Sequence, residues 1–272
     1  MLKNKTIFIT GASRGIGKAI ALELASKGAN IVVAAKSVQE DARLGGTIHA
    51  TVQEIEAIGA KALAIQLDVR DEAQIIAAVD QAVQHFGGID VLINNASAIS
   101  LTPTTATESK RYDLMMGINV RGTFLMSKHC IPHLKRSNNA HIINLSPPLN
   151  IQPKWFGNHT AYTMSKYGMS MIVMGLAEEL KKDNIAVNAL WPRTTIATAA
   201  VKNLLGGEAL MQMSRTPQIL ADCVRIILEK PSASATGNFY IDEAVLAAEG
   251  ITDLGHYAVN PAQPLYTDLF VD

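Results

Sequence analysis

Short apolar runs alternate with longer amphipathic segments along most of the chain. The apolar runs predict strands over residues 5–10, 30–35, 61–69, 90–96, 140–146, 185–190 and 237–242. The segments between them predict helices over residues 15–27, 47–59, 72–87, 108–135 and 159–182. Strands that are apolar throughout are buried on both faces, as in a parallel sheet that helices cover on each side. The alternation therefore predicts an α/β fold built on a doubly wound parallel sheet.

Length and composition fit one domain that acts on a small molecule. The 272 residues contain no internal repeat or linker, so we expect a single domain over 1–272, with 243–272 as a C-terminal extension. A formal net charge of zero argues against nucleic acid as the main partner. No apolar run reaches the ~18 residues that a membrane span needs. The start of the chain lacks a signal-peptide pattern and both cysteines lie in apolar segments, so we expect a cytoplasmic protein with reduced thiols.

A glycine-rich stretch, "TGASRGIG", follows the first predicted strand. Gly11, Gly15 and Gly17 lie where this strand passes into a helix. Glycine permits a tight turn and lets a phosphate approach the backbone, and the helix N-terminus supplies free N–H groups and a positive dipole end. Sheets of this class bind ligands beyond the carboxyl ends of their strands. We therefore expect a Rossmann-like dinucleotide site here, rather than a simple Gly-rich turn.

Five motifs occur in an order that is typical of one enzyme family. They are "TGASRGIG", "NNAS" at 94–97, Asn119 in "GINVRGTF", "YTMSK" at 162–166 and "VNALWP" at 187–192. Together they resemble the short-chain dehydrogenase/reductase family, from residue 5 to about 242. Further stretches, such as "LSPPLN" and "DLMMGINVRGT", resemble one subgroup of that family. The resemblance implies an oxidoreductase that transfers a hydride between a nicotinamide cofactor and a carbonyl or alcohol.

The resemblance also implies roles for individual residues. Asn119 would anchor a water molecule in a proton relay, Lys166 would hold the nicotinamide ribose, and Asp68 would contact the adenine amino group. The cofactor contacts implied in this way are Gly11, Ser13, Arg14, Gly15, Ile16, Gly17, Lys36, Asp68, Val69, Asn95, Ala96, Lys166 and Ile196. Pro192-Arg193 stands where the family usually has Pro-Gly, and Glu243-Ala244 where it has glycines, so we expect an unusual lid over the substrate.

Tyr162 and Lys166 are four residues apart and therefore share one face of a helix. A free phenol has a pKa near ~10, which is too high for efficient proton exchange at neutral pH. A neighbouring ammonium group favours the phenolate and lowers that pKa. In this context the pair predicts that Tyr162 is a general acid to a carbonyl or a general base to an alcohol. Alone, the same spacing would fit an ordinary surface helix.

Ser146 is the candidate catalytic serine, but two prolines follow it. Most members of the family have two adjacent serines here, and the second orients the substrate oxygen; Pro147 stands in its place and has neither hydroxyl nor N–H. The prolines could re-aim the backbone so that Ser146 reaches the substrate, which we favour. Alternatively, Ser146 is a structural turn residue and Asn150 or His159 assists. Trp155 and Phe156, in the same loop, could be pocket wall or buried anchors.

The end of the second predicted strand favours NADP over NAD. Relatives that prefer NAD often carry an aspartate there for the ribose hydroxyls, whereas this chain has Ala35 followed by Lys36. A carboxylate would repel a 2′-phosphate and a lysine would attract it. Arg14, in the glycine loop, could supply a second cation. Solvated surface roles for Lys36 and Arg14 are the alternative.

The sequence thus predicts an NADP-dependent oxidoreductase that acts on an apolar carbonyl or alcohol. The apolar, Gly-ended segment 194–207 would cover the substrate. By resemblance, helices 108–135 and 159–182 would pair subunits in a homodimer or homotetramer. His129 and His133 share a helix face, but no third ligand completes a metal site, so we expect none. The rival interpretations are a catalytically silent nucleotide-binding regulator, which intact Tyr162 and Lys166 oppose, and an epimerase or dehydratase of the extended fold, which the glycine spacing opposes.

Overall fold

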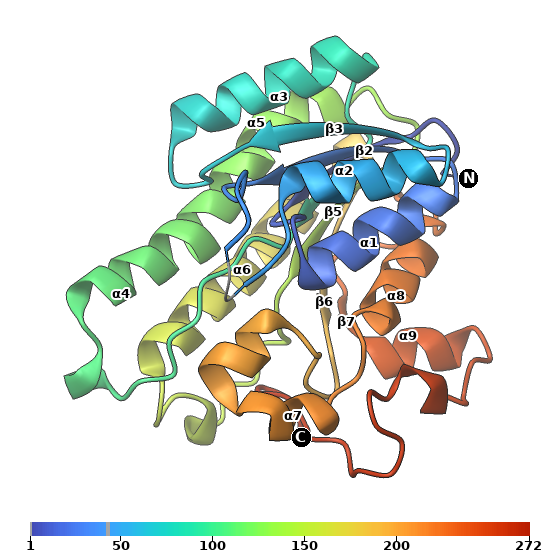
Figure 1. The fold of residues 1–272 in the computed structure, drawn as a ribbon. Helices are drawn as coiled ribbons and strands as arrows, with labels where there is room; N and C mark the ends of the chain where they lie inside the picture. The colour runs from blue at the N-terminus through green and yellow to red at the C-terminus, as the bar shows by residue number, and fades with distance from the viewer. Residues whose placement is uncertain (1, 42–43) are drawn as a thin grey trace.

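One parallel sheet of seven strands organises the part of the chain that the structure describes (Figure 1). The computed structural model describes residues 2–41 and 44–272. Its strands are β1 (Thr6–Thr10), β2 (Asn30–Ala35), β3 (Lys61–Gln66), β4 (Val91–Asn94), β5 (Ala140–Leu145), β6 (Ile185–Trp191) and β7 (Phe239–Ile241). Their order across the sheet is β3-β2-β1-β4-β5-β6-β7, and every neighbouring pair is parallel. The predicted doubly wound sheet is therefore confirmed, with its switch of direction between β1 and β4.

Helices cover both faces of the sheet (Figure 1). On one face lie α1 (Gly15–Ser26), α2 (Ile48–Ala57) and α8 (Gln218–Leu228), and on the other α3 (Glu72–Phe86), α5 (Thr123–Leu134) and α6 (Thr160–Glu179). Each face has its own apolar core: Ile20, Leu24 and Val224 pack on the first, Ile75, Met126 and Val173 on the second. Continuous apolar strands are explained by this double burial, since both faces of each strand are covered.

The predicted helix over residues 108–135 is three joined segments. It consists of α4 (Ser109–Met115), the π-helical η2 (Met116–Gly122) and α5, which contains Pro132. A π-helical turn is rare and is often found at functional sites. Here it contains Asn119, whose side chain is fully buried.

Sequence analysis assigned no helix between residues 193 and 236, and the structure has three helical segments there. They are the π-helical η5 (Val201–Leu205), α7 (Gly207–Gln212) and α8. Helix α8 is the most regular of them, and it buries an apolar stripe that includes Ile219, Cys223 and Ile227 against α1 and the sheet. Short 3₁₀ helices complete the connections: η1 (Thr104–Ala106), η3 (Pro153–Trp155) and η4 (Lys181–Asp183). No helix in the described residues is long and apolar enough to cross a membrane.

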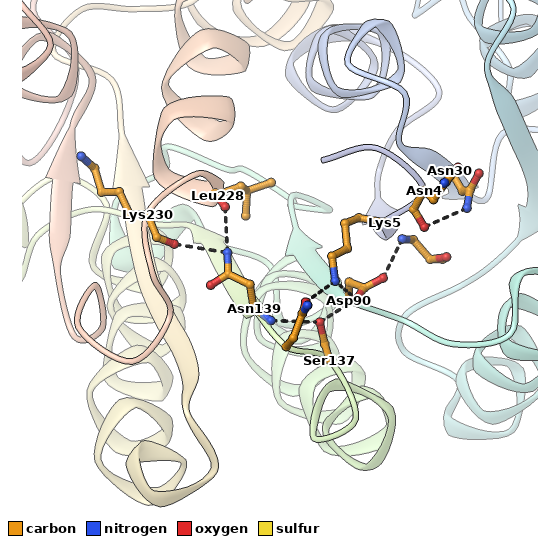
Figure 2. A network of polar contacts seen from close by, with 10 residues as sticks. Asn4, Lys5, Asn30, Asp90, Ser137, Asn139, Leu228 and Lys230 are labelled. Carbon is orange, nitrogen blue, oxygen red and sulfur yellow. Dashed lines mark hydrogen bonds and ion pairs between the residues drawn. The ribbon is translucent and has the colours of Figure 1, made fainter. Parts of the chain in front are cut away.

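A polar network fixes the amino-terminal edge of the sheet (Figure 2). Asp90, which precedes β4, accepts hydrogen bonds from Lys5 Nζ at 2.8 Å and from Ser137 Oγ at 2.5 Å. Asn139, just before β5, donates to the carbonyl oxygens of Leu228 and Lys230, at the end of α8. These contacts join β1, β4, β5 and α8 at the amino-terminal edge of the sheet. A ligand would bind at the opposite edge, beyond the carboxyl ends of the strands.

The last thirty residues return to the carboxyl edge of the sheet. After α9 (Asp242–Ala248) and η6 (Gly255–Tyr257), the chain runs back so that its C-terminus lies near α7 (Figure 1). An antiparallel bridge pairs Thr267 with Thr194, just after β6. We call residues 258–272 the C-terminal tail. Phe270 of this tail is fully buried at a backbone φ of 70°.

Candidate active site

The glycine loop is folded tightly against the end of β4. Gly11 has a φ of 67°, a left-handed conformation that glycine adopts without strain. The Asn95 side-chain amide donates to the carbonyl oxygens of Thr10 and Gly11 at 3.0 and 2.9 Å. A Cβ atom at Gly17 would lie 2.5 Å from that same amide nitrogen, so the close approach requires glycine. Asn95 therefore holds the loop by its side chain, a structural role beside its predicted contact to the cofactor.

A cleft of about 510 Å³ opens in front of this loop, at the switch point of the sheet. The first turn of α1 faces this cleft. Arg14 stands at the N-cap position of the helix, and its side chain makes no capping hydrogen bond. Helix N–H groups that no side chain satisfies form a natural anion site. The geometry thus suits a phosphate group.

Most of the predicted cofactor residues line this cleft. Those on its wall are Gly11, Ser13, Arg14, Gly15, Ile16, Lys36, Asp68, Val69, Asn95 and Ala96. Gly17 lies beneath the loop, and Ile196 is buried in the core beside α8, so neither is on the wall. Sequence reasoning did not include Ser37, Leu44, Ser97, Ile99, Thr198 and Leu204, which also line it.

Two cations lie at the end of β2. Arg14 donates through Nη2 to Ser37 Oγ at 2.8 Å and through Nε to the Gly45 carbonyl at 2.6 Å. Lys36 Nζ lies 3.2 Å from Asp68 Oδ2, and most of its side chain is exposed. Arg70 hydrogen-bonds to the same carboxyl group and holds the pKa of Asp68 well below its usual range. Lys36 is therefore paired with a carboxylate, whereas the hydrogen bonds of Arg14 go to neutral groups and the Asp41 carboxylate acts on it through its charge.

A second pocket of about 640 Å³ adjoins the cleft. Ile99 and Leu204 line both cavities, so the two are neighbours. Tyr162, on α6, lies on the wall of this second pocket and is 5% exposed. Burial, together with the charge of Asp268, raises the pKa of Tyr162 above its ordinary value, which is opposite to the lowering by Lys166 that the sequence predicts. The neutral phenol is thus the resting form of Tyr162 at neutral pH.

Lys166 lies one turn along α6 from Tyr162 and is almost completely buried. Its Nζ donates to the Leu145 carbonyl oxygen at 2.6 Å and lies 5.0 Å from the centre of the Trp191 ring. Burial lowers the pKa of Lys166 to about 7, and the charge of Asp268 acts in the opposite direction. An ammonium group with few hydrogen bonds in an apolar site gives up its proton near neutral pH.

Asn119 joins two elements that carry site residues. Its Oδ1 accepts from the Ala98 amide at 2.8 Å, and its Nδ2 donates to the Ala98 carbonyl and to Ser165 Oγ, each at 2.9 Å. Ser165 in turn donates to the Tyr162 carbonyl oxygen at 2.8 Å. The side chain of Asn119 therefore ties the loop after β4 to α6.

Ser146 follows β5, but its hydroxyl does not reach the pocket wall. The side chain is fully buried, and Oγ has no hydrogen-bond partner among the described residues. Of the two other donors considered, Asn150 is bound to the Asp272 carboxyl group at 3.0 Å and His159 to Thr163 Oγ1 at 3.0 Å. This placement favours a structural role for Ser146, because its hydroxyl is covered and lies on the wall of neither cavity.

The aromatic residues of this loop pack on the C-terminal tail. Trp155 lies 5.9 Å from the Phe270 ring, and Phe156 packs edge-on against Tyr167 at 5.5 Å. Neither is on the wall of either cavity beside Tyr162. In the described structure both act as anchors of the loop.

The tail is the part of the site that sequence reasoning missed. Tyr266, Thr267, Asp268 and Leu269 line the second pocket, and Phe270 lies behind Tyr162 with a ring-to-ring distance of 6.1 Å. Residues 243–272 were expected only to extend the domain. A cluster of aromatic and acidic residues in "PLYTDLFVD" is the one local signal that could have pointed to a packed segment.

Comparison with known proteins agrees with this geometry. A family model described as "short chain dehydrogenase" matches residues 5–208. The chain is 60% identical over 267 residues to hydroxysteroid dehydrogenase-like protein 2 of Xenopus tropicalis, which covers 98% of this chain and 63% of that protein. It therefore spans less than two thirds of the length of that relative.

Solved structures show the same fold. A short chain dehydrogenase from Mycobacterium thermoresistibile is 50% identical and superposes with a TM-score of 0.94, over 100% of this chain and 96% of that one. A blue fluorescent protein from a metagenomic library, in complex with NADPH, is 31% identical with a TM-score of 0.75, over 88% and 96%. The predicted resemblance is confirmed, and the chain belongs to the short-chain dehydrogenase family.

Proposed function

We propose that the chain is an NADP-dependent oxidoreductase that interconverts an apolar carbonyl compound and its alcohol, with Tyr162 as general acid and base. The observation that carries this proposal is the place of Tyr162 on the wall of a pocket that adjoins the glycine-loop cleft. A phenol at such a junction can reach a substrate whose reacting carbon lies beside a cofactor in the cleft.

The cleft fits a dinucleotide. The uncapped first turn of α1 would receive the diphosphate, and the wall around Asp68 and Val69 would receive the adenine end. The nicotinamide end would lie towards Ile99 and Leu204, which are shared with the second pocket. When bound, the nicotinamide supplies or accepts the hydride.

In the direction of carbonyl reduction, Tyr162 donates its proton to the substrate oxygen as the hydride reaches the carbon. The buried phenol is suited to this step, because its raised pKa keeps it protonated. Lys166 stabilises the phenolate that remains, and its own carbonyl contact orients its ammonium group. In the reverse direction Tyr162 takes the proton from the alcohol. Asn119 holds α6 in place and would anchor the water that re-protonates the phenol.

The second pocket supports an apolar substrate. The apolar residues on its wall are Ile99, Leu101, Trp191, Val201, Leu204, Leu205, Ala209, Leu210, Met213 and Leu269. Burial of such surface favours ligands with extended hydrocarbon parts, by roughly 25 cal/mol per Å². Segment 194–207, predicted as the lid, contributes Val201, Leu204 and Leu205 to this wall.

The preference for NADP rests on the end of β2. Ala35 provides no carboxylate for the ribose hydroxyls, and the Arg14 guanidinium lies on Ser37, one residue past Lys36. A similar family member has been crystallised with NADPH. We expect Ala35→Asp with Lys36→Ala to reverse the preference, because the new carboxylate would repel a 2′-phosphate. The dissociation constants of NADPH and NADH measure this, and tighter NADH binding by the unaltered protein would contradict it.

Tyr162→Phe tests the assignment of the acid and base. The change removes one hydroxyl from a position that makes no hydrogen bond in the described structure, so folding and nucleotide binding should be kept. Turnover in a screen of aldehydes, ketones and alcohols of varied chain length should fall by about 10²–10⁴-fold. A variant that retains more than half of the activity would remove Tyr162 from this role.

We also propose that the chain forms a homodimer or homotetramer through α5 and α6. Four large apolar side chains are exposed on these helices, namely Phe124, Met164, Met171 and Met174. Apolar side chains that gather on one surface are typical of protein interfaces.

A further inference from the structure

The C-terminal tail places an acidic side chain on the wall of the pocket that the proposed catalytic tyrosine also lines. The Asp268 amide donates to the Arg193 carbonyl oxygen at 3.0 Å, and the next residue accepts a hydrogen bond from Trp191 Nε1 at 2.9 Å. These bonds fix the tail on the carboxyl end of β6. Asp268 is half-buried there and lines the same pocket as Tyr162.

The pocket lacks the second donor that a substrate oxygen needs beside the phenol. Pro147 has none, and Ser146 Oγ is covered. Among the other polar residues of the wall, Thr195 is bonded to Ser214 Oγ at 2.8 Å, and Tyr266 lies at the rim with half of its surface exposed. Thr267 is exposed too. Asp268 is thus the polar side chain that remains within the pocket.

We propose that Asp268, in its protonated form, is a catalytic residue that donates a second hydrogen bond to the substrate oxygen beside Tyr162. This inference rests on the oxidoreductase function proposed above. In carbonyl reduction the hydride adds to the carbon, the π electrons move to the oxygen, and Tyr162 supplies the proton that forms the O–H bond. Asp268 keeps its own proton and stabilises the charge that develops on the oxygen.

The surroundings of Asp268 suit a neutral carboxyl group. Its Oδ1 accepts from the Leu269 amide at 2.7 Å, and this is the one hydrogen bond to the carboxyl group within the described residues, so the proton can reside on Oδ2. Burial raises the pKa of Asp268 to about 7; Asp242 adds to the rise, and Lys166 opposes it. A carboxylic acid kept neutral by an apolar site can serve as a donor to an oxyanion.

Charged groups around Asp268 determine how the reaction depends on pH. Tyr162 and Lys166 face it from α6, Asp242 from the start of α9, and Arg193 follows β6, where its guanidinium group bonds to the Asp272 backbone carbonyl at 2.5 Å. Above neutral pH, Asp268 loses its proton and becomes a negative charge beside the developing oxyanion. Carbonyl reduction should therefore fall as pH rises through the pKa of Asp268.

The test compares Asp268→Asn, which keeps a donor but cannot ionise, with Asp268→Leu, which has none. Asp253→Asn, an exposed acid in the loop after α9, is the control. Steady-state kcat and KM for carbonyl reduction with NADPH are measured from pH 5.5 to 9, with NADPH affinity as the check on folding. We expect Asp268→Leu to lose roughly 10²–10³-fold in kcat with unchanged NADPH binding. Asp268→Asn should remain within about tenfold of the unaltered protein and show a shallower fall above pH 7, because only the part due to Lys166, whose pKa is also about 7, is left.

Three results would overturn the inference. They are an Asp268→Leu variant with more than half of the original kcat, equal losses in both variants, and an unchanged pH profile in Asp268→Asn. If Asp268→Leu fails to bind NADPH, the pH profile of Asp268→Asn decides alone. Absence of turnover by the unaltered protein with every carbonyl tested would instead refute the proposed function, and this inference with it.

Discussion

Phe270→Ala should destabilise the protein strongly, because Phe270 is the centre of the aromatic cluster behind the pocket. Its ring is fully buried and contacts the rings of Trp155, His159, Tyr162, Tyr167 and Trp191, at centroid distances between 5.3 and 6.1 Å. Replacement of a buried phenylalanine by alanine typically costs about 3–5 kcal/mol in the free energy of unfolding. For a chain of this size that corresponds to a drop in Tm of about 6–20 °C.

Phe270→Gly distinguishes the effect of losing the packed ring from the effect of backbone strain at this position. Phe270 has a φ of 70°, which costs a non-glycine residue about 1–2 kcal/mol. Phe270→Gly also loses the ring but adopts this conformation without strain. It should therefore be more stable than Phe270→Ala by about 1 kcal/mol, after the greater chain entropy of glycine is counted.

Tryptophan fluorescence during urea unfolding measures these changes directly. The chain has two tryptophans, and both rings lie 5.9 Å from Phe270, so the signal reports on this cluster. Ile151→Ala, at a position that is 82% exposed in the neighbouring loop, is the control and should change stability by less than about 0.5 kcal/mol. A Phe270→Ala variant as stable as this control would refute the view that the tail is an integral part of the core.

Ser146→Ala should leave turnover within about tenfold of the unaltered protein and should not destabilise it, because the lost hydroxyl is buried without a partner. A loss of roughly 10²-fold in kcat would place Ser146 on the substrate oxygen instead. Burial lowers the pKa of His141 to about 4, so the unfolded chain takes up a proton that the folded protein does not, and the contribution of His141 to stability should fall by roughly 3 kcal/mol from pH 6.5 to 4. The raised pKa of Asp268 acts in the opposite direction over this range, so urea titrations measure the contribution of His141 as the change with pH in the difference between the unaltered protein and His141→Gln. Met171→Glu with Met174→Glu should convert the proposed oligomer to monomers in light scattering coupled to gel filtration, and an unaltered oligomeric mass would exclude α6 from the interface.

The sheet could be predicted from the sequence because the apolar runs that indicate strands are also the segments that the fold buries. β2 and β5 are mostly apolar, with Asn30 in the first and His141 and Asn144 in the second, and their neighbours in the sheet and the helices on both faces bury them. The glycine loop was predictable for a related reason, since glycine adopts the left-handed turn at Gly11 without strain and the close contact of Gly17 with Asn95 leaves no room for a Cβ atom.

The rest of the site depends on contacts between residues far apart in the chain. Asp268 lines the pocket beside Tyr162 only because the tail pairs with the segment after β6, about seventy residues earlier, and no local pattern announces that pairing. The burial of the Ser146 hydroxyl is likewise a product of tertiary packing. The π-helical turn around Asn119 also escaped prediction, because its apolar spacing is close to that of an ordinary helix.

The tail lies outside the segments that carry the glycine loop and the pair Tyr162 and Lys166. The family model covers residues 5–208, which include the glycine loop and the helix that carries Tyr162 and Lys166, whereas the tail lies entirely beyond that range. The part of the pocket wall that the tail supplies can therefore change in sequence without any change in the glycine loop or in the helix that carries Tyr162 and Lys166. Substitutions at Tyr266, Thr267 and Leu269, which line the pocket beside Asp268, would be a compact route to altered specificity, both for natural divergence and for protein engineering.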